Sequence, residues 1–265
     1  MKNVLLGSLA LVTAAAAGPA FAADFPVKAA PPASVYNWTG FYAGGNGGLA
    51  WSGTLTGFSG GPGTAAFFAA NEFPTTLAPD LRGWFAGAQI GYNWQVSPIW
   101  LVGLEADIQG GENNGNSSIT LTPANLAAFT TSVEQHSNWF GTVRGRVGLL
   151  AGPVLFYGTG GLAYGQTEAS QSTIATGFTL ATCPTALPCA AGSVNSTRIG
   201  WSAGAGIETM VAPNWTLRAE YLFVDLGVQS LTVTTRAFTP PVTFTSSNPF
   251  RESVLRVGFN YKFGG

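Results

Sequence analysis

The segment Trp215-Thr-Leu-Arg-Ala-Glu-Tyr-Leu-Phe223 decides the fold class, because its side chains alternate in polarity over most of its length. Alternation of this kind indicates a β-strand with one apolar face and one polar face. Arg218 and Glu220 lie on the polar face, which therefore carries charges of both signs. The apolar face consists of Trp215, Leu217, Ala219, Tyr221 and Phe223.

The same period-2 pattern recurs along the chain and predicts eight strands. Two of the eight segments, residues 38–51 and 154–167, are rich in glycine and show the pattern less clearly. The clear copies are residues 84–95, 100–109, 139–149, 199–208, 215–223 and 253–263.

The composition indicates which way the apolar faces point. Only 9% of the 265 residues are charged, compared with roughly 25% in an ordinary soluble domain. A soluble sandwich would need more charge on its wet surface, and a disordered chain would be less hydrophobic than 46%. The net charge of -1 argues against nucleic-acid binding, which needs clustered basic residues. We therefore expect the apolar faces to contact lipid and the polar faces to line the inside of a membrane β-barrel.

The connections between the segments alternate between short and long. The short ones, near residues 96–98, 151–153 and 211–214, contain Pro, Gly, Ser and Asn, which favour turns. The long ones, near residues 52–80, 113–135, 168–194 and 229–250, are rich in Thr, Ser, Asn, Gly and Pro. This order predicts an all-β fold, an eight-stranded antiparallel up-and-down transmembrane β-barrel with short periplasmic turns and four long outer loops.

The N-terminus predicts export. Residues 1–22 combine a basic start at Lys2, an apolar stretch and the small-residue site Ala20-Phe21-Ala22, which is the pattern of a cleaved secretory signal peptide. Residues 23–35 are a Pro- and Ala-rich periplasmic leader, and residues 36–265 are the expected barrel. After the signal peptide no stretch is as long and apolar as a spanning helix requires.

All eight tryptophans fall at the ends of predicted strands, which indicates two aromatic belts. An indole ring favours the boundary between membrane and water. A tilted strand from Trp84 to Trp94 would cover about 25 Å of membrane height. The belt beside the long loops is Trp51, Trp84, Trp139 and Trp201, and the belt beside the short turns and the leader is Trp38, Trp94, Trp100 and Trp215.

Four segments combine glycine and aromatic residues in a family-specific pattern. They are Tyr36-Asn-Trp-Thr-Gly-Phe-Tyr-Ala-Gly-Gly-Asn-Gly-Gly48, Pro153-Val-Leu-Phe-Tyr-Gly-Thr-Gly-Gly-Leu-Ala-Tyr-Gly165, Leu217-Arg-Ala-Glu-Tyr-Leu-Phe-Val-Asp-Leu-Gly227 and Val254-Leu-Arg-Val-Gly-Phe-Asn-Tyr-Lys-Phe263. They resemble the first, fifth, seventh and eighth strands of the small opacity-type outer-membrane β-barrel proteins of Gram-negative bacteria.

The resemblance implies an outer-membrane location, contact with outer-membrane lipids and lipopolysaccharide, and surface roles such as adhesion. It also implies that the C-terminal aromatic residues Phe259, Tyr261 and Phe263 are the assembly signal read by the outer-membrane insertion machinery. Family members commonly end at that last aromatic residue, whereas here Gly264 and Gly265 follow it.

No set of residues predicts catalysis, a cofactor or a metal site. Ser202 stands in a Gly-x-Ser-x-Gly motif, but a hydrolase elbow needs a strand-to-helix turn and a later histidine. Ser202 lies inside an alternating segment, and the single histidine, His136, precedes it. His136 has Glu134, Ser132 and Ser137 nearby at the outer rim of the fourth strand, which leaves a lipid A-modifying enzyme as the weakest alternative.

The two cysteines, Cys183 and Cys189, lie between Thr-, Ala- and Gly-rich segments. Because an exported chain meets an oxidising compartment, we expect them to form a disulfide in the third long loop. With one histidine and no further cysteine, the chain does not resemble a zinc protein.

The inward-facing charges are the most informative polar residues. An eight-stranded barrel is only wide enough for its own side chains, and near-balanced charge predicts ion pairs between neighbouring strands because unpaired buried charge is costly. Strand parity places inside the barrel Arg144, Arg146, Arg218, Arg256 and Lys262, together with Glu105, Asp107, Glu208 and Glu220. The pairs expected between neighbouring strands are Glu105 and Asp107 with Arg144 and Arg146, Glu208 with Arg218, and Glu220 with Arg256.

We therefore expect a closed, salt-bridged barrel that stabilises the envelope and presents its loops to the exterior, without catalysis. A small passive channel is the alternative, although a selective pore more often has a ring of charges of one sign. The surface ligand is not identified by the sequence.

Overall fold

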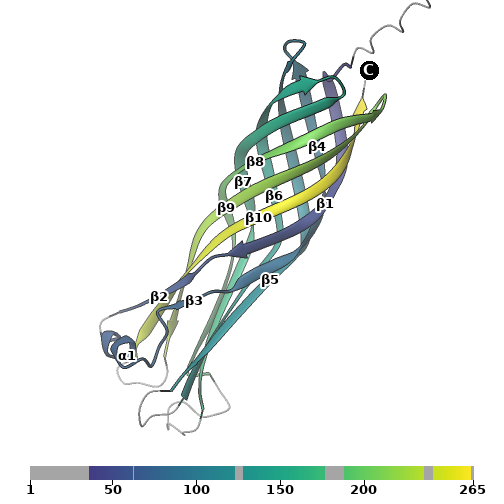
Figure 1. Ribbon diagram of the computed structural model, residues 1–265. Helices are drawn as coiled ribbons and strands as arrows, with labels where there is room; N and C mark the ends of the chain where they lie inside the picture. Colours follow the sequence, from purple (N-terminus) through teal and green to yellow (C-terminus); the bar gives the residue numbers. More distant parts are fainter. Residues whose placement is uncertain (1–35, 62, 123–127, 177–187, 236–240, 264–265) are drawn as a thin grey trace, which may run out of the picture. The chain divides into compact units, whose positions relative to one another are not determined.

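The computed structural model describes residues 36–61, 63–122, 128–176, 188–235 and 241–263. Within them, eight long strands form a closed antiparallel ring, because β1 pairs with β4 on one side and with β10 on the other (Figure 1). The expected eight-stranded up-and-down barrel is confirmed. The strands of the ring are β1 (Gly40–Gly53), β4 (Asp80–Gln95), β5 (Trp100–Leu121), β6 (Ala128–Ala151), β7 (Val154–Thr176), β8 (Ala190–Ala212), β9 (Trp215–Thr234) and β10 (Thr243–Phe263).

The predicted signal peptide, residues 1–22, and the predicted leader, residues 23–35, lie outside the described residues. Among the described residues there is one helix, the short α1 (Ala65–Ala69). A search of the same residues finds no helix with the length and apolar character needed to cross a membrane.

The faces of the strands follow the alternation in the sequence. On β9, the outward side chains of Leu217 and Tyr221 are 51% and 42% exposed, whereas the inward side chains of Arg218 and Glu220 are buried. Large apolar side chains are exposed in the same way along the other strands of the ring. This arrangement reverses that of a soluble protein, and it is the one that a lipid environment stabilises.

The three short turns form where the sequence predicts them. The first joins β4 to β5, and the backbone N–H of Val96 donates to the carbonyl of Trp100 at 3.0 Å. The second joins β6 to β7 and contains Gly152 at φ +61°, a backbone conformation that glycine adopts without steric cost. The third joins β8 to β9 at residues 213–214.

Three of the four long connections are largely strand, which corrects the expectation that all four are loops. Most of residues 113–135, 168–194 and 229–250 belong to β5 to β10, which extend far beyond the predicted belt beside these connections. The first connection contains β2 (Thr56–Gly60), α1 and β3 (Thr76–Leu77), and β2 pairs with β10. Thr, Ser and Asn occur both in loops and on wet strands, so composition does not separate the two cases.

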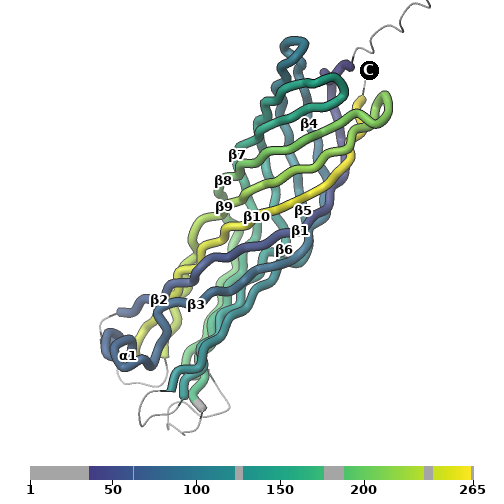
Figure 2. The backbone as a smooth tube through the Cα atoms, viewed as in Figure 1, coloured from purple at the N-terminus to yellow at the C-terminus, as the bar shows by residue number. Residues whose placement is uncertain are grey.

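At this end the barrel wall divides into two sheets. Pairing between β4 and β5 ends at Arg82 and Asn114, and pairing between β8 and β9 ends at Trp201 and Asp225. Beyond these points β5, β6, β7 and β8 continue as one sheet, while β9 and β10 continue with β2 and β3 as the other (Figure 2). We call this part of the chain the strand extension.

Arg198 on β8 joins the two sheets where the ladder is interrupted. Its Nη2 donates to the carbonyl of Val228 at 2.6 Å, and its Nε donates to the carbonyl of Leu226 at 3.4 Å. Gly227, between these two residues, has φ +80°. The guanidinium thus donates hydrogen bonds to carbonyl groups of β9 that would otherwise accept them from the backbone of β8.

Candidate functional site: an ionic cluster inside the barrel

Eight charged side chains meet inside the barrel, and none is more than 4% exposed. Their formal charges cancel, because four guanidinium groups face four carboxylates. Five different strands contribute to them, so the cluster depends on the closed ring. The ionic cluster consists of Glu105 and Asp107 on β5, Arg144 and Arg146 on β6, Glu208 on β8, Arg218 and Glu220 on β9, and Arg256 on β10.

Arg144 lies at the centre of the ionic cluster. Its guanidinium contacts three carboxylates: Glu105 at 2.5 Å, Asp107 at 2.9 Å and Glu220 at 2.5 Å. Its Nε donates to the hydroxyl of Thr142 at 2.9 Å. Buried charges are tolerated when they are both paired and hydrogen-bonded, and Arg144 meets both conditions.

Two predicted pairs between neighbouring strands are present. Glu105 and Arg144 are direct partners in the register of β5 and β6 and form an ion pair. Glu220 and Arg256 are direct partners in the register of β9 and β10, with Oε1 and Nη2 3.0 Å apart. The same Nη2 atom of Arg256 also lies 2.9 Å from Asp107, on the far side of the lumen.

The expected pairing of Glu208 with Arg218 is wrong, although the two residues are direct partners in the register of β8 and β9. Arg218 instead reaches Glu105 at 2.5 Å, and Glu208 accepts from Arg146 at 3.0 Å. The lumen is narrow enough for a long arginine to reach the opposite wall. Charge balance over the whole layer, rather than adjacency, decides the pairs.

Two tyrosines that the sequence analysis missed complete the site. Tyr42 donates its hydroxyl hydrogen to Glu105 at 2.7 Å, and Tyr157 donates to Glu220 at 2.8 Å. The guanidinium carbon of Arg146 lies 4.8 Å from the centre of the Tyr42 ring and 5.2 Å from that of Tyr157, close enough for cation–π attraction to both. Their glycine-rich strands gave a weak alternation, so neither tyrosine stood out.

A glycine makes room for one of these rings. A Cβ on Gly206 of β8 would stand 2.6 Å from the hydroxyl oxygen of Tyr157. A larger residue at this position would displace the tyrosine from Glu220. Glycines on the inward faces therefore have a packing role in this narrow barrel.

Trp38 seals the short-turn end from inside, which corrects its assignment to an aromatic belt. Its side chain is 1% exposed and packs with Leu101, Leu150 and Leu155. The chain entering β1 crosses the end of the barrel, and the backbone N–H of Trp38 donates to Gln95 at 3.1 Å. The position of Trp38 next to the leader predicts a place in the belt. The apolar side chains inside the barrel end bury the indole ring instead.

Lys262 faces inward as predicted, and it is 6% exposed. Its partner is not a carboxylate, because Nζ donates to the backbone carbonyl of Asn37. Lys262 therefore holds the segment before β1 in place at the short-turn end and stands apart from the ionic cluster.

Further apolar and polar layers fill the barrel on the other side of the ionic cluster. Phe85 and Phe140 pack edge to face, with ring centres 4.9 Å apart, among the buried residues Leu222, Val224 and Val254. A polar layer follows, in which Gln135 donates to Thr56 at 3.0 Å and to Asn248 at 3.2 Å. An aromatic layer lies inside the strand extension and contains Phe58, Phe67, Phe68, Phe73 and Phe244.

The sequence matches the outer membrane protein beta-barrel domain family over residues 8–263. The chain belongs to this family. A curated relative, the 31 kDa outer-membrane immunogenic protein of Brucella melitensis, is 33% identical over 99% of this chain and 100% of its own length. The 22 kDa outer membrane protein of Rhizobium leguminosarum is 29% identical over 65% of this chain and 63% of its own length. The solved structure of the outer membrane protein OprG from Pseudomonas aeruginosa is similar, with 12% identity, a TM-score of 0.46 and coverage of 86% of this chain and 98% of that chain.

As a member of this family, the protein is located in the bacterial outer membrane, as the sequence predicts. In such barrels the short turns face the periplasm and the long connections face outward. The seal around Trp38 is then periplasmic, and the strand extension is exterior.

Seven of the eight tryptophans remain candidates for the two belts of this outer-membrane barrel. Trp139 is half-buried, and its Nε1 donates to Gln166 at 3.0 Å. Whether the membrane boundaries coincide with the belts stays a prediction. The six others, Trp51, Trp84, Trp94, Trp100, Trp201 and Trp215, are between 43% and 53% exposed on the outer surface.

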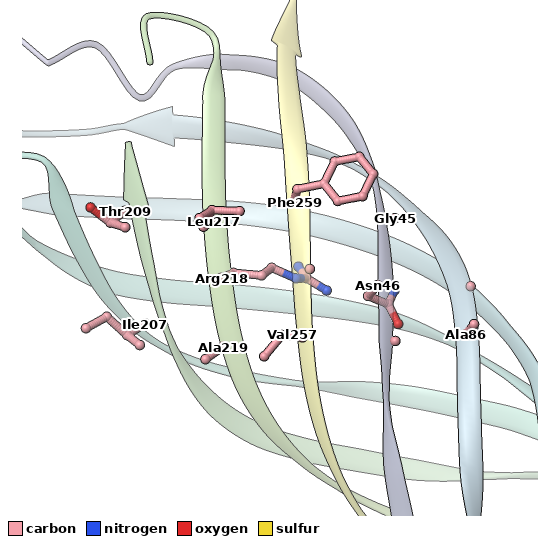
Figure 3. A pocket seen from close by; sticks show the side chains of 13 residues that line it. Gly45, Asn46, Ala86, Ile207, Thr209, Leu217, Arg218, Ala219, Val257 and Phe259 are labelled. Carbon is pink, nitrogen blue, oxygen red and sulfur yellow. The ribbon is translucent and has the colours of Figure 1, made fainter. Parts of the chain in front are cut away.

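A shallow groove of about 630 Å³ interrupts the membrane-facing surface between β8 and β4 (Figure 3). Small residues, among them Gly45, Gly47 and Ala86, form part of its lining, and Leu217 and Phe259 add bulk. Most of the lining residues are apolar, as expected of a surface that contacts lipid chains, and Asn46, Thr209 and Arg218 are the polar ones.

The described residues do not bring His136, Ser137 and Glu134 together in one hydrogen-bonded group. The side chain of His136 points outward from β6, and Nδ1 lies 2.8 Å from the Asn114 amide oxygen. Ser137 points to the opposite face and is fully buried, while Glu134 lies 3.5 Å from the Ser170 hydroxyl. Within the described ranges no group of three His, Cys, Asp or Glu residues could hold a metal ion.

Cys189 is disulfide-bonded. Cys183, the other cysteine of the sequence, lies outside the described residues. The aromatic residues of the predicted assembly signal end β10, where Phe259 and Phe263 are 49% and 54% exposed and Tyr261 is half-buried. Recognition by the insertion machinery stays a prediction.

Proposed function

We propose that this protein is a closed, non-catalytic outer-membrane barrel that stabilises the envelope and presents its strand extension for contact outside the cell. The observation that carries the proposal is the ionic cluster, whose eight buried charges fill the lumen and cancel. Free movement of a solute would require these contacts to break.

Two further features support closure and a surface role. The Trp38 seal lies on the periplasmic side of the ionic cluster, and the Phe85–Phe140 layer lies on the exterior side. The Brucella relatives are named outer-membrane immunogenic proteins, which agrees with a role at the cell surface.

Purified wild-type protein in a planar bilayer tests closure. We expect rare or very small conductance, because the ionic cluster, the Trp38 seal and the Phe85–Phe140 layer would all have to move. Steady, large channels would refute the closed barrel. Deletion of the protein should sensitise cells to detergent, and restoration by wild-type protein but not by an empty vector completes the test.

A narrow water or ion path is the second candidate. Several inward polar atoms have no hydrogen-bond partner among the described residues, including both amide atoms of Gln109 and of Gln171. Buried polar groups usually bind water when protein partners are lacking. Small, cation- or anion-selective steps in the same bilayer recordings would favour this candidate.

A further inference from the structure

The strand extension leaves one edge of the β5–β8 sheet without a partner. Pairing of β5 with β4 ends at Asn114, but β5 continues to Leu121 and pairs there only with β6 among the described residues. Ser118, Ile119 and Thr120 are exposed in succession, so the alternation of buried and exposed residues seen lower in the strand is lost. β3 approaches β5 at this end without pairing with it. Residues 118–120 are thus exposed on both faces, and no strand among the described residues pairs with the β4 side of residues 116–121.

The free backbone groups of this edge can be assigned. The carbonyl of Ile99 accepts from β6, and the carbonyl of Trp100 accepts from β4. In an antiparallel strand successive residues direct their N–H and C=O groups to opposite neighbours. Pairing with β4 is continuous up to Asn114, so even-numbered residues face the β4 side. Asn116, Ser118 and Thr120 therefore direct their donors and acceptors toward the open side.

The edge has none of the features that usually prevent strand addition. Natural sheet edges are protected by charged residues, proline or bulges. The open stretch, Asn116-Ser-Ser-Ile-Thr-Leu121, contains neither charge nor proline. Its pairing with β6 runs from Asn113 to Leu121 without a shift in register.

The outward face beside this edge is acidic. Glu134 on β6 is the register partner of Asn116, and Glu168 on β7 is the partner of His136 one row below. Glu112 follows on β5 itself and is exposed. The outward face of β5 to β8 beyond the belt has no lysine or arginine in its described part. Arg82 on β4 lies below the open stretch, opposite Asn114.

We propose that the open edge of β5, residues 116–121, binds an extended polypeptide segment of another protein, which adds as a further strand with basic side chains on its outward face. Backbone hydrogen bonds supply binding and alternate side chains supply specificity in this mode of recognition. Lysine or arginine on the outward face would lie near Glu134 and Glu112, and an apolar residue on the inward face would pack against Ile119. The inference rests on the proposed surface-contact function and specifies its partner.

A fluorescent peptide of alternating lysine and valine, with the full-length protein in detergent micelles, tests the inference. Wild-type protein should bind it. A peptide with glutamate in place of lysine should not bind, and a peptide with proline in place of alternate valines should not bind although it keeps the charge. Equal binding of the proline peptide would mean that only charge attracts the peptide, and would overturn strand addition.

Ser118→Pro is the decisive variant, because it removes an N–H on the open side and leaves the pairing with β6 intact. We expect it to lower affinity for the peptide about tenfold, the loss expected from one or two backbone hydrogen bonds. Ser118→Ala is the matched control and should bind as wild type does. Glu134→Gln should weaken binding by about two- to fivefold, as for an exposed charge contact. Unchanged binding to a folded Ser118→Pro protein would refute the proposal.

Cross-linking keeps the proposal testable if Ser118→Pro fails to fold. A cysteine at position 116 (Asn116→Cys) should form a mixed disulfide with a cysteine placed in the peptide, whereas Ser193→Cys on the outward face of β8 should not. Equal cross-linking at both positions would refute a specific edge site. If the open edge does not bind the peptide, while the barrel is closed and the deletion strain is sensitive to detergent, strand addition is refuted and the proposed function still holds. Large steady channels would refute the proposed function whatever the peptide does.

Discussion

Replacement of Arg144 by methionine is the sharpest test of the ionic cluster. Methionine keeps an unbranched, flexible side chain but removes the guanidinium group and its charge. Glu105, Asp107 and Glu220 each lose their contact with Arg144, and the cluster changes from neutral to a net charge of -1. Arg218 and Arg256 still contact these carboxylates, so the damage is partial.

We expect Arg144→Met to lower the free energy of unfolding by about 3 kcal/mol, the lower end of the range for breaking a buried ion pair. Such a loss corresponds to a change of about 150-fold in the folding equilibrium at 1.36 kcal/mol per tenfold. Denaturant titration of the protein in lipid vesicles measures it. Folded and unfolded fractions are separated by gel mobility without boiling, because a folded barrel resists the detergent.

Arg251→Met is the matched control. Arg251 also contacts a carboxylate, Asp225, at 2.9 Å, but its side chain is 53% exposed. We expect a loss of about 0–1 kcal/mol, as for other exposed pairs. The double variant Arg144→Met with Glu220→Gln restores neutrality and should recover about 1 kcal/mol or more relative to additivity. Similar losses for Arg144→Met and Arg251→Met, or an additive double variant, would refute the role of charge balance.

Three further changes test other parts of the molecule. Trp38→Ala should lower the unfolding free energy by about 3–5 kcal/mol, because it empties a buried site, and should raise bilayer conductance; a stable, silent variant would contradict the periplasmic seal. His136→Ala should leave the lipid A profile of the cells unchanged, since the ring nitrogen Nδ1 is hydrogen-bonded to Asn114 rather than to Ser137 or Glu134, and an altered profile would revive the enzyme hypothesis. Cys183→Ser should leave the barrel's denaturation midpoint nearly unchanged, because a disulfide across a short loop constrains the unfolded chain little; free thiols in wild-type protein from oxidised envelopes would show that the expected disulfide is absent.

The sequence predicts the ring well because alternation sets the face of every strand. The polarity of Arg218 and Leu217 is enough to assign one side chain to the lumen and the other to the lipid. A shift of the strand register by one residue would place the charges in lipid. The predicted neighbours Glu105 and Arg144 also pair, since register follows from short turns. These results depend only on local pattern.

The errors arise where distant parts of the barrel meet. Glu208 and Arg218 lie on neighbouring strands, but each forms its ion pair with a residue on a more distant strand of the barrel. Trp38 is buried by the opposite wall of the barrel, which no local pattern reveals. Tyr42 and Tyr157 were missed because glycines dilute the alternation of their strands. The sequence predicts loops where the strand extension lies, because solvent-exposed strands and loops share a polar composition.

The ion pairs of the ionic cluster connect strands that are distant in the sequence, which has a consequence for biogenesis. These pairs join β6 to β9, β9 to β5, and β10 to β5. The cluster charges balance within the β5–β6 hairpin, but the β8–β9 hairpin has one carboxylate in excess and the β9–β10 hairpin has one arginine in excess. A partly assembled sheet would carry bare arginines and carboxylates toward hydrocarbon, where they are strongly unfavourable. Insertion and closure should therefore occur in one concerted step, and arrested intermediates should stay in the periplasm rather than enter the bilayer.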